Sequence, residues 1–361
     1  MSEIWILGAT GRSGRAVAKH LAATQFSPVL VGRDAVRLRA LAAATGRELR
    51  IVTASSVDAM IAEISRNKPT VVISTIGPFT KTAVSIARAC PPGTHYVDIS
   101  NELPSLIALL ALHDEAASSG RTFVTAAGFG VLATESLVLK LCEGWPPALR
   151  VRVDAVPSVE SEPGRLGDAL AATIIDAAAG GGRRYANGRL ERVRAFSDVE
   201  TLRLPDGSTV KTACGPTGDL EAARGASGAS FALAASSLAP TSALLRALLP
   251  PAMSLLRIAA IGDLAKRRLA AVEFKPKKPG EPKGHEFSWT HAKVEWATGE
   301  TREGWLRVGD AMTFTTAIMV EVASRLARGE GRMGAYTPGA LFGPELALQM
   351  GGQFFLDQKA P

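Results

Sequence analysis

Apolar residues change their spacing repeatedly along the first part of the chain. Between short β-branched runs, apolar residues recur at helical spacing, as Val17 with Leu21 and Leu38 with Leu41 do. Alternating strands and helices predict an α/β fold with a doubly wound parallel sheet over residues 1–127. The runs that we interpret as strands are Glu3–Leu7, Pro28–Val31, Leu49–Thr53, Thr70–Thr75, His95–Ile99 and Thr122–Ala126.

The alternation changes after about residue 130. Residues Phe287 to Val308 predict a hairpin with its turn at Gly299–Glu300, and a shift of the apolar phase near His291 predicts a bulge. We therefore expect an α+β second domain over residues 128–310. Its further predicted strands are Arg150–Val156, Glu191–Ala195 and Glu200–Leu204.

A helical stripe follows the hairpin and ends at Gly329, which is typical of a glycine C-terminal signal. A long helix of this kind needs a surface to cover. The stripe consists of Ala311, Thr315, Ile318, Met319, Val322 and Leu326.

One segment, Leu238–Gly262, is apolar for its length but is interrupted by Arg246, Arg257 and the Pro250–Pro251 pair. A membrane span needs about 20 consecutive apolar residues. We expect two buried or interface helices; the alternative is a surface that receives a long apolar substrate or rests on lipid.

Composition and charge narrow the class of protein. The 361 residues are 47% apolar, with 41 basic and 34 acidic side chains, so two modules with their own cores are expected. The three cysteines lie far apart, and the acidic start with Gly8 close behind differs from a signal peptide, so we expect a cytoplasmic protein. The lysine run at 275–283 is broken by prolines, which favours a solvated loop over a nucleic-acid or acidic-carrier patch.

A glycine-rich loop follows the first predicted strand, and a helix follows the loop. Glycine there permits a sharp turn, close approach to a pyrophosphate and tight contact between helix and strand, and the helix N-terminus offers N–H groups to phosphate. The pattern predicts a dinucleotide-binding Rossmann domain. Its residues are Gly8, Ala9, Thr10, Gly11, Arg12, Ser13 and Gly14.

The end of the second strand indicates which dinucleotide binds. Many NAD enzymes place Asp or Glu there, whereas this chain has Gly32 and Arg33, whose guanidinium suits a phosphate. We infer that NADP(H) is favoured over NAD(H). The alternative is that Arg33 is an ordinary surface residue and that Asp34 bonds a ribose.

The fourth strand ends in a further candidate loop, which lies at the carboxyl edge of the sheet where ligands bind. We expect it beside the ribose and nicotinamide; the alternative is a plain Gly-Pro turn that starts the next helix. The loop is Ser74, Thr75, Ile76, Gly77, Pro78 and Phe79.

Several segments together resemble the saccharopine dehydrogenase-like oxidoreductases, which include the trans-acting enoyl reductases of polyketide lipid synthesis. Besides the glycine loop they are Val31–Asp34, Gly77–Phe79, Gly93–Asp98 with Glu102, Ala127–Gly130 and Ala335–Pro344. The resemblance implies a Rossmann domain, an inserted mixed-sheet domain for substrate and dimerisation, and C-terminal helices over 311–361 that return to the first domain. It also implies hydride exchange between a nicotinamide at the domain cleft and a C=N or C=C bond.

The family's catalytic pattern is incomplete here. Related proteins often carry an acidic residue where this chain has Gly130. Three alternatives follow: Glu135 or another residue supplies the acid, the substrate needs no acid at this point, or catalysis has been lost. Our catalytic candidates are Tyr96 as a proton donor, Lys81 as its partner and Asp98 as an orienting carboxylate. The structural alternatives are a strand tyrosine, a solvated lysine and, for Asp98 with Glu102, helix capping.

These observations predict an NADP-dependent oxidoreductase that acts on an apolar small molecule, free or carrier-bound. The alternatives are an inactive NADP-binding scaffold or sensor and an amino-acid dehydrogenase, which needs cations such as Arg302 and Arg307 in its cleft. We expect no nucleic-acid partner, no stable membrane span and a homodimer through the second domain. The scattered histidines predict no metal site.

Overall fold

The computed structural model describes residues 3–158, 164–165, 175, 180–242, 255–256, 258–274 and 286–356. The chain forms two compact units, and each unit is built from two separate segments. Unit 1 comprises Met1–Phe129 and Met312–Phe342, and unit 2 comprises Gly130–Ala311 and Gly343–Pro361.

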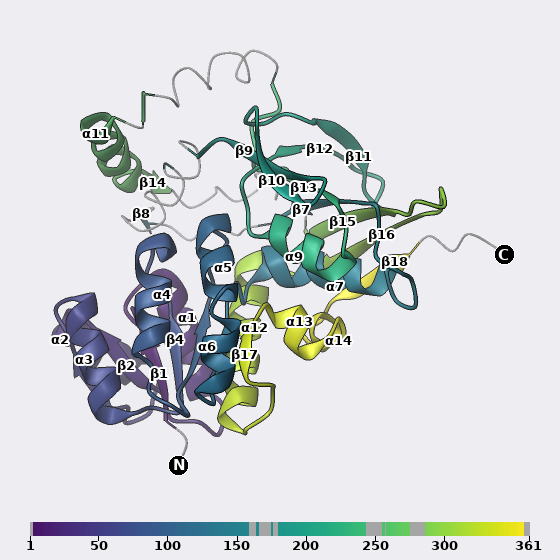
Figure 1. Cartoon of the computed structure of the whole chain (residues 1–361). Helices are drawn as coiled ribbons and strands as arrows, with labels where there is room; N and C mark the ends of the chain where they lie inside the picture. The colour runs from purple at the N-terminus through teal and green to yellow at the C-terminus, as the bar shows by residue number, and fades with distance from the viewer. Residues whose placement is uncertain are drawn as a thin grey trace. The chain divides into compact units, whose positions relative to one another are not determined.

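Unit 1 is a parallel sheet in the order β17-β6-β5-β4-β1-β2-β3 with helices on both faces (Figure 1). Its strands are β1 Ile4–Leu7, β2 Val29–Gly32, β3 Ile51–Thr53, β4 Val71–Ser74, β5 His95–Asp98, β6 Thr122–Val124 and β17 Gly334–Tyr336. Its helices are α1 Arg12–Ala22, α2 Ala35–Ala44, α3 Val57–Asn67, α4 Phe79–Ala89, α5 Leu103–Leu110, α6 His113–Ser118, α12 Ala311–Ala327 and α13 Pro338–Phe342. This architecture confirms the predicted doubly wound sheet and the return of a C-terminal helix to the first domain. The returning segment ends at Phe342, whereas residues Gly343–Pro361, which the sequence also assigned to it, belong to unit 2.

The sheet of unit 1 is buried on both faces, and this explains why its strands are continuous apolar runs. All four residues of β1, β2 and β4 are buried. On one face, Trp5, Val72 and Tyr96 pack against Ile64 of α3 and Ile86 of α4. The seventh strand, β17, pairs in parallel with β6 and extends the sheet from the far end of the chain.

Unit 2 is built on a mixed sheet in the order β10-β9-β13-β7-β15-β16-β18, in which β7 and β13 run parallel. Its strands are β7 Arg150–Val156, β9 Gly182–Ala186, β10 Arg189–Val193, β11 Glu200–Arg203, β12 Thr209–Cys214, β13 Phe231–Ser236, β15 Ser288–Glu295, β16 Thr301–Val308 and β18 Gln353–Leu356, with the short pair β8 Gly164–Arg165 and β14 Glu273–Phe274. Its helices are α7 Phe129–Leu141, α9 Asp219–Ser227, α11 Ala259–Ala270 and α14 Glu345–Gln349. The mixed sheet confirms the predicted second domain.

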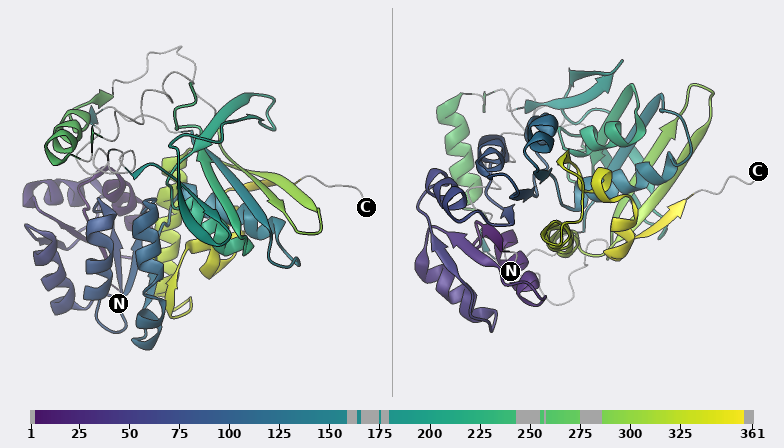
Figure 2. Two further views of the ribbon diagram at one scale, coloured as in Figure 1. Left: turned by 45° about the horizontal axis from the view of Figure 1, so that its top comes forward. Right: turned by 60° about the horizontal axis from the view of Figure 1, so that its bottom comes forward.

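The β15–β16 hairpin is the longest strand pair of unit 2 and is drawn in light green in Figure 2 (left). The predicted hairpin is confirmed, but the predicted bulge near His291 is wrong. Pairing runs without interruption from Ser288 with Val308 to Glu295 with Thr301. The apolar phase shifts because both faces of β15 are buried there, with Trp289 on one face and Ala292 on the other.

Two segments noted in the sequence are described only in part. Of Leu238–Gly262, residues 243–254 and 257 lie outside the described residues, as does the lysine run at 275–283. Among the described residues, no helix is both long and apolar enough to cross a bilayer.

Candidate functional site

The glycine loop leaves β1 through Gly8, whose φ of +74° is in the left-handed region that favours glycine. The N–H groups of Gly8 and Ala9 both donate to the Val31 carbonyl, each at 3.1 Å, and this ties the loop to the end of β2. The Gly11 N–H donates to the Gly8 carbonyl at 2.9 Å and closes the turn before α1.

Gly14 brings α1 against the backbone of this loop. A Cβ at position 14 would lie 2.3 Å from the Gly8 carbonyl oxygen and 2.8 Å from the Ala9 Cα. Both contacts are with backbone atoms, which cannot swing aside as a flexible side chain can. The third glycine therefore serves the close contact between helix and strand that the sequence predicts for a dinucleotide loop.

The first turn of α1 differs from those of the next two helices, whose N-cap side chains accept from backbone N–H groups. Asp34 caps α2 by accepting from Val36 and Arg37, and Ser56 caps α3. Within the described residues, α1 begins at Gly11 with no side-chain cap. Its first turn therefore presents backbone N–H groups and a positive dipole end toward an anion, as pyrophosphate binding requires.

The loop after β4 lies directly beside the glycine loop. The Thr75 N–H and the Thr75 hydroxyl both donate to the Leu7 carbonyl, at 3.1 and 2.8 Å. A Cβ on Gly8 would lie 2.8 Å from the Thr75 Oγ1. The Thr75 hydroxyl also lies within hydrogen-bond distance of the Gly8 carbonyl, at 3.2 Å. The structure thus brings together two predicted cofactor segments although Gly8 and Thr75 are 67 residues apart in the sequence. The Gly77–Pro78 peptide of this loop is cis.

Glu102 caps α4, which is the helix that follows this loop. Its Oε1 accepts from the Phe79 N–H at 3.1 Å, and its Oε2 accepts from the Thr80 N–H at 2.8 Å. A carboxylate at a helix N-terminus is stabilised by the dipole as well as by the hydrogen bonds. Capping was the structural alternative for this carboxylate, but the capped helix precedes Glu102 in the chain, a non-local pairing that sequence spacing did not indicate.

Asp98 is fully buried at the end of β5 and organises the neighbouring loops. Its Oδ1 accepts from the Ser100 N–H, the Thr125 hydroxyl and the Ala126 N–H at 2.9–3.0 Å. Burial raises the pKa of Asp98, and these hydrogen bonds oppose the rise. The contacts indicate a positioning role, because they hold the loops that follow β5 and β6.

The other two predicted catalytic residues lie in different environments. Tyr96 is fully buried in the apolar core of unit 1, and burial together with the Asp98 carboxylate raises its pKa well above the usual value. Lys81 is exposed on the first turn of α4. The Tyr96 hydroxyl is buried without a hydrogen-bond partner among the described residues, and the charged side chain that raises its pKa is Asp98. The burial favours the structural interpretation of Tyr96.

Two arginines contact the backbone of Thr10 in the glycine loop, and a third, Arg33, follows the neighbouring strand. Arg33 is exposed directly after β2. Arg15 Nη1 and Arg37 Nη2 both donate to the Thr10 carbonyl, at 3.0 and 3.3 Å. They line a pocket of about 290 Å³ together with Thr10, Lys19, Ala40, Leu41 and Ala44.

The sequence analysis did not single out Arg15 or Arg37. The feature of the sequence that could have indicated Arg37 is its position four residues after Arg33. Because the Asp34 carboxylate caps α2, it is engaged with backbone N–H groups. This arrangement favours the phosphate interpretation of Arg33 over a ribose contact by Asp34.

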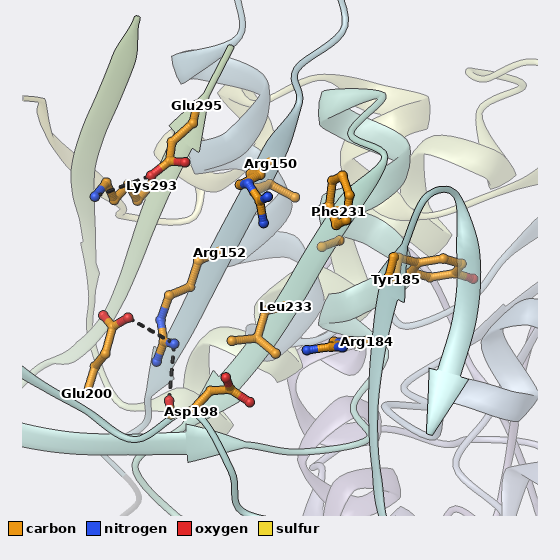
Figure 3. A pocket seen from close by; sticks show the side chains of 13 residues that line it. Arg150, Arg152, Arg184, Tyr185, Asp198, Glu200, Phe231, Leu233, Lys293 and Glu295 are labelled. Carbon is orange, nitrogen blue, oxygen red and sulfur yellow. Dashed lines mark hydrogen bonds and ion pairs between the residues drawn. The ribbon is translucent and has the colours of Figure 1, made fainter. Parts of the chain in front are cut away.

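Unit 2 has a separate pocket of about 460 Å³ on one face of its sheet (Figure 3). Its charges are largely matched within the unit: Arg152 pairs with Asp154 at 2.8 Å and with Glu200 at 3.1 Å, and Lys293 pairs with Glu295 at 3.4 Å. The Arg150 guanidinium lies over the Phe231 ring at 4.4 Å. These pairings leave the pocket without a concentrated charge of one sign.

A buried histidine joins three strands beside this pocket. His291 Nδ1 lies 3.0 Å from Asp154 Oδ2, and its Nε2 lies 2.8 Å from Glu303 Oε1. Burial lowers the pKa of His291, but the hydrogen bonds to the two carboxylates outweigh it and raise the pKa to about 9. With both ring nitrogens engaged, this group holds the sheet together.

The remaining residues weighed from sequence are also engaged or buried. Arg302 donates to the Leu141 carbonyl and lies over the Trp145 ring, and Arg307 donates to Gln353. Glu135 is buried on α7. Among the described residues, no group of three or more His, Cys, Asp or Glu side chains is arranged to hold a metal ion.

Comparisons with known proteins agree with this geometry. Residues 4–124 match the family model described as the saccharopine dehydrogenase NADP binding domain. A trans-acting enoyl reductase of Mycobacterium leprae is 31% identical over 146 residues, which are 38% of this chain and 35% of that protein. One of Mycobacterium ulcerans is 32% identical over 140 residues, 37% of this chain and 34% of that protein. The matched part thus spans only about a third of these curated relatives.

A solved structure matches along the whole chain. Apo saccharopine dehydrogenase (L-Glu forming) from Saccharomyces cerevisiae superposes with a TM-score of 0.61 at 15% identity, covering 99% of this chain and 100% of that chain. At this identity the likeness concerns the fold alone. The chain therefore carries an NADP-binding domain of the saccharopine dehydrogenase type over residues 4–124 and has the saccharopine dehydrogenase fold, which confirms the predicted resemblance, fold class and cofactor.

Proposed function

We propose that this chain is an NADP-dependent oxidoreductase that transfers hydride between the nicotinamide and a C=C or C=N bond of an apolar, acyl or lipid-like substrate. The observation that carries the proposal is the glycine loop. Gly8 turns the chain, Gly14 admits α1 to the loop backbone, and α1 keeps its first turn without a side-chain cap. This geometry suits a pyrophosphate.

Three groups of described residues would each bind a different part of the cofactor. Gly8–Gly14 and the first turn of α1 would hold the pyrophosphate, and Ser74–Phe79 would lie beside the ribose and nicotinamide. Arg15 and Arg37, whose guanidinium groups both donate to the Thr10 carbonyl, would hold the 2′-phosphate together with Arg33, which follows β2 directly. NADPH, when bound, supplies the hydride.

The substrate class is supported by the names of the matched relatives and by an apolar segment of the chain. The matched relatives are named trans-acting enoyl reductases, whose name implies reduction of a carbon–carbon double bond. The apolar segment of residues 238–262 lies in the half of the chain that does not bind nucleotide. We include in the proposal a free or carrier-bound small-molecule substrate, a cytoplasmic location and a homodimer through unit 2.

The predicted catalytic residues take different roles in this proposal. Asp98 positions the loops at the end of β5 and β6. Lys81 is the exposed member of the three and lies on the first turn of α4, next to the Ser74–Phe79 loop. Replacement of Lys81 therefore tests a direct contact with substrate or cofactor. Replacement of Tyr96 tests the packing of the core of unit 1.

An inactive NADP-binding scaffold is the second candidate function. Gly130 in place of a family acid and the full burial of Tyr96 favour it. The amino-acid dehydrogenase alternative has less support, because Arg302 and Arg307 are engaged with neighbouring backbone, amide and aromatic groups.

Two measurements on the purified chain decide among these candidates. NADPH fluorescence is expected to shift on binding, and the Arg33→Ala and Arg37→Ala variants are expected to weaken NADPH binding by about tenfold or more, because a hydrogen bond to a charged group contributes about 1.5–3 kcal/mol. Binding of NADH is expected to change little. Substrate-dependent loss of NADPH absorbance with enoyl thioesters would exclude the scaffold, and loss only with saccharopine-like imines would favour the amino-acid enzyme.

A further inference from the structure

Exposed apolar side chains gather on one short segment of unit 2. Among the described residues, eleven large hydrophobic side chains are exposed, and five of them lie within residues 255–272. They are Leu255, Ile258, Ile261, Leu264 and Val272. Single exposed apolar residues are ordinary, but a contiguous group on a protein surface marks an interaction site.

Helical spacing places the central members of this group along one side of α11. Ile258 is the N-cap residue, and Ile261 and Leu264 follow at steps of three. Two other positions of the helix are buried, Gly262 and Ala270, and a Cβ on Gly262 would lie 2.6 Å from the Leu256 carbonyl. Leu264 is 57% exposed and Ile258 is 52% exposed, so this side of α11 is accessible to solvent.

Basic residues accompany this apolar side. Arg267 and Arg268 are exposed in the last turn of α11, and neither forms an ion pair with a described residue. In the sequence, residues 257–283 contain eight basic and three acidic side chains, a net charge of +5, while the whole chain carries +7. Within residues 255–272, which carry the exposed apolar side chains, four basic and one acidic side chains give a net charge of +3, and the lysine run at 275–283 that follows in the sequence lies outside the described residues.

We propose that this α11 face, defined as Leu255, Ile258, Ile261, Leu264, Arg267 and Arg268, rests on an anionic lipid surface. An amphipathic helix that lies in the interface places apolar side chains at the headgroup–acyl boundary and basic ones near lipid phosphates. The charge selects anionic lipid, because each basic residue near such a surface adds about 1 kcal/mol of attraction that salt screens. One short helix gives reversible, peripheral binding, and the inference does not depend on the proposed reaction.

Vesicle co-sedimentation of the full chain tests the proposal. Vesicles of phosphatidylcholine mixed equally with phosphatidylglycerol are expected to bind the protein at low salt at least about tenfold better than pure phosphatidylcholine, and added salt is expected to release it. The double variant Ile261→Asp/Leu264→Asp is expected to lose binding to both vesicles. Arg267→Ala/Arg268→Ala is expected to lose only the preference for anionic lipid, by about tenfold or more, at 1.4 kcal/mol for each tenfold.

Matched controls separate this face from general surface hydrophobicity. Leu190→Asp on β10 and Leu348→Asp on α14 replace leucines that are each 41% exposed, and they are expected to leave vesicle binding unchanged. Circular dichroism and thermal unfolding of every variant report whether the chain is folded. The salt and lipid dependence of the unaltered protein decides the question even where a variant unfolds.

Several outcomes would overturn the proposal. They are the absence of vesicle binding by the unaltered protein, equal binding to both vesicle types, and an equal loss in the Leu190 or Leu348 control. A dimer in solution that Ile261→Asp/Leu264→Asp dissociates would show that a second copy of the chain covers this face instead.

Discussion

Replacement of Gly14 by alanine tests the glycine loop most sharply. The new Cβ would begin 2.3 Å from the Gly8 carbonyl oxygen, whereas ordinary contact starts at 3.4 Å, so α1 and the loop must separate by about 1 Å. Overpacking of this kind costs about 1–3 kcal/mol, while alanine in a helix regains about 0.5–1 kcal/mol relative to glycine. We therefore expect a net loss of up to about 2.5 kcal/mol, centred near about 1 kcal/mol, in the free energy of unfolding.

The same displacement moves the amide groups that would face the pyrophosphate. A hydrogen bond to a charged group contributes about 1.5–3 kcal/mol, so the loss of one weakens NADPH binding by about tenfold or more. Denaturant unfolding measures the first effect, and titration of NADPH fluorescence measures the second.

Two other glycine replacements serve as comparisons. A Cβ on Gly225, which lies on α9, would meet no atom within 4 Å, so Gly225→Ala is expected to stabilise unit 2 slightly and to leave NADPH affinity unchanged. A Cβ on Gly11 would lie 3.2 Å from the Gly8 carbonyl, and the effect of Gly11→Ala is expected to be intermediate. Normal stability and NADPH affinity in Gly14→Ala would refute the packing argument.

Three further predictions concern caps and buried charges. Glu102→Ala is expected to cost about 1 kcal/mol of unfolding free energy by removing the acceptor of two α4 N–H groups, and Glu102→Gln less; equal costs by denaturant titration would contradict this. Asp98→Ala leaves three buried donors without their acceptor and is expected to cost roughly 3 kcal/mol or more of unfolding free energy. Asp98→Asn keeps an acceptor and is expected to cost about 1 kcal/mol. If Asp98→Asn lowers turnover more than it lowers stability, Asp98 takes part in the chemistry rather than only positioning the loops. The folded pKa of His291 is raised from 6.5 to about 9, so its stabilisation is complete below pH 6.5 and is lost as pH rises toward 9, at about 1.4 kcal/mol per pH unit. Unfolding titrations should show this slope in the unaltered protein and not in His291→Gln, and a flat profile in both would show that Asp154 and Glu303 do not hold a proton on the ring.

Most of unit 1 was predictable because its strands obey a strong physical constraint. A parallel sheet covered on both faces requires short, continuous apolar runs, and all six predicted strands occur with bounds shifted by only one or two residues. The glycine loop was predictable for a related reason, since Gly8 and Gly14 are required by backbone conformation and contact. The seventh strand, β17, comes from the far end of the chain and has no local signal.

The features that sequence reasoning missed depend on contacts between distant residues. Glu102 caps a helix that begins 23 residues before it, and Arg37 reaches the Thr10 carbonyl across 27 residues. The alternation in β5 predicts that Tyr96 and Asp98 share a face but not that helices cover that face. In β15 both faces are buried, so the spacing of apolar residues changes near His291 although the strand pairing is continuous. The sequence pattern therefore predicted a bulge there that does not occur.

Calorimetric titration of the purified chain with NADPH and NADH tests the central claim, which is an NADP site formed by the glycine loop and the arginines around Thr10. We expect NADPH to bind at least about tenfold more tightly than NADH, and this preference to disappear in Arg33→Ala/Arg37→Ala. Failure to bind either nucleotide, or an equal affinity for both in the unaltered protein, would contradict the account.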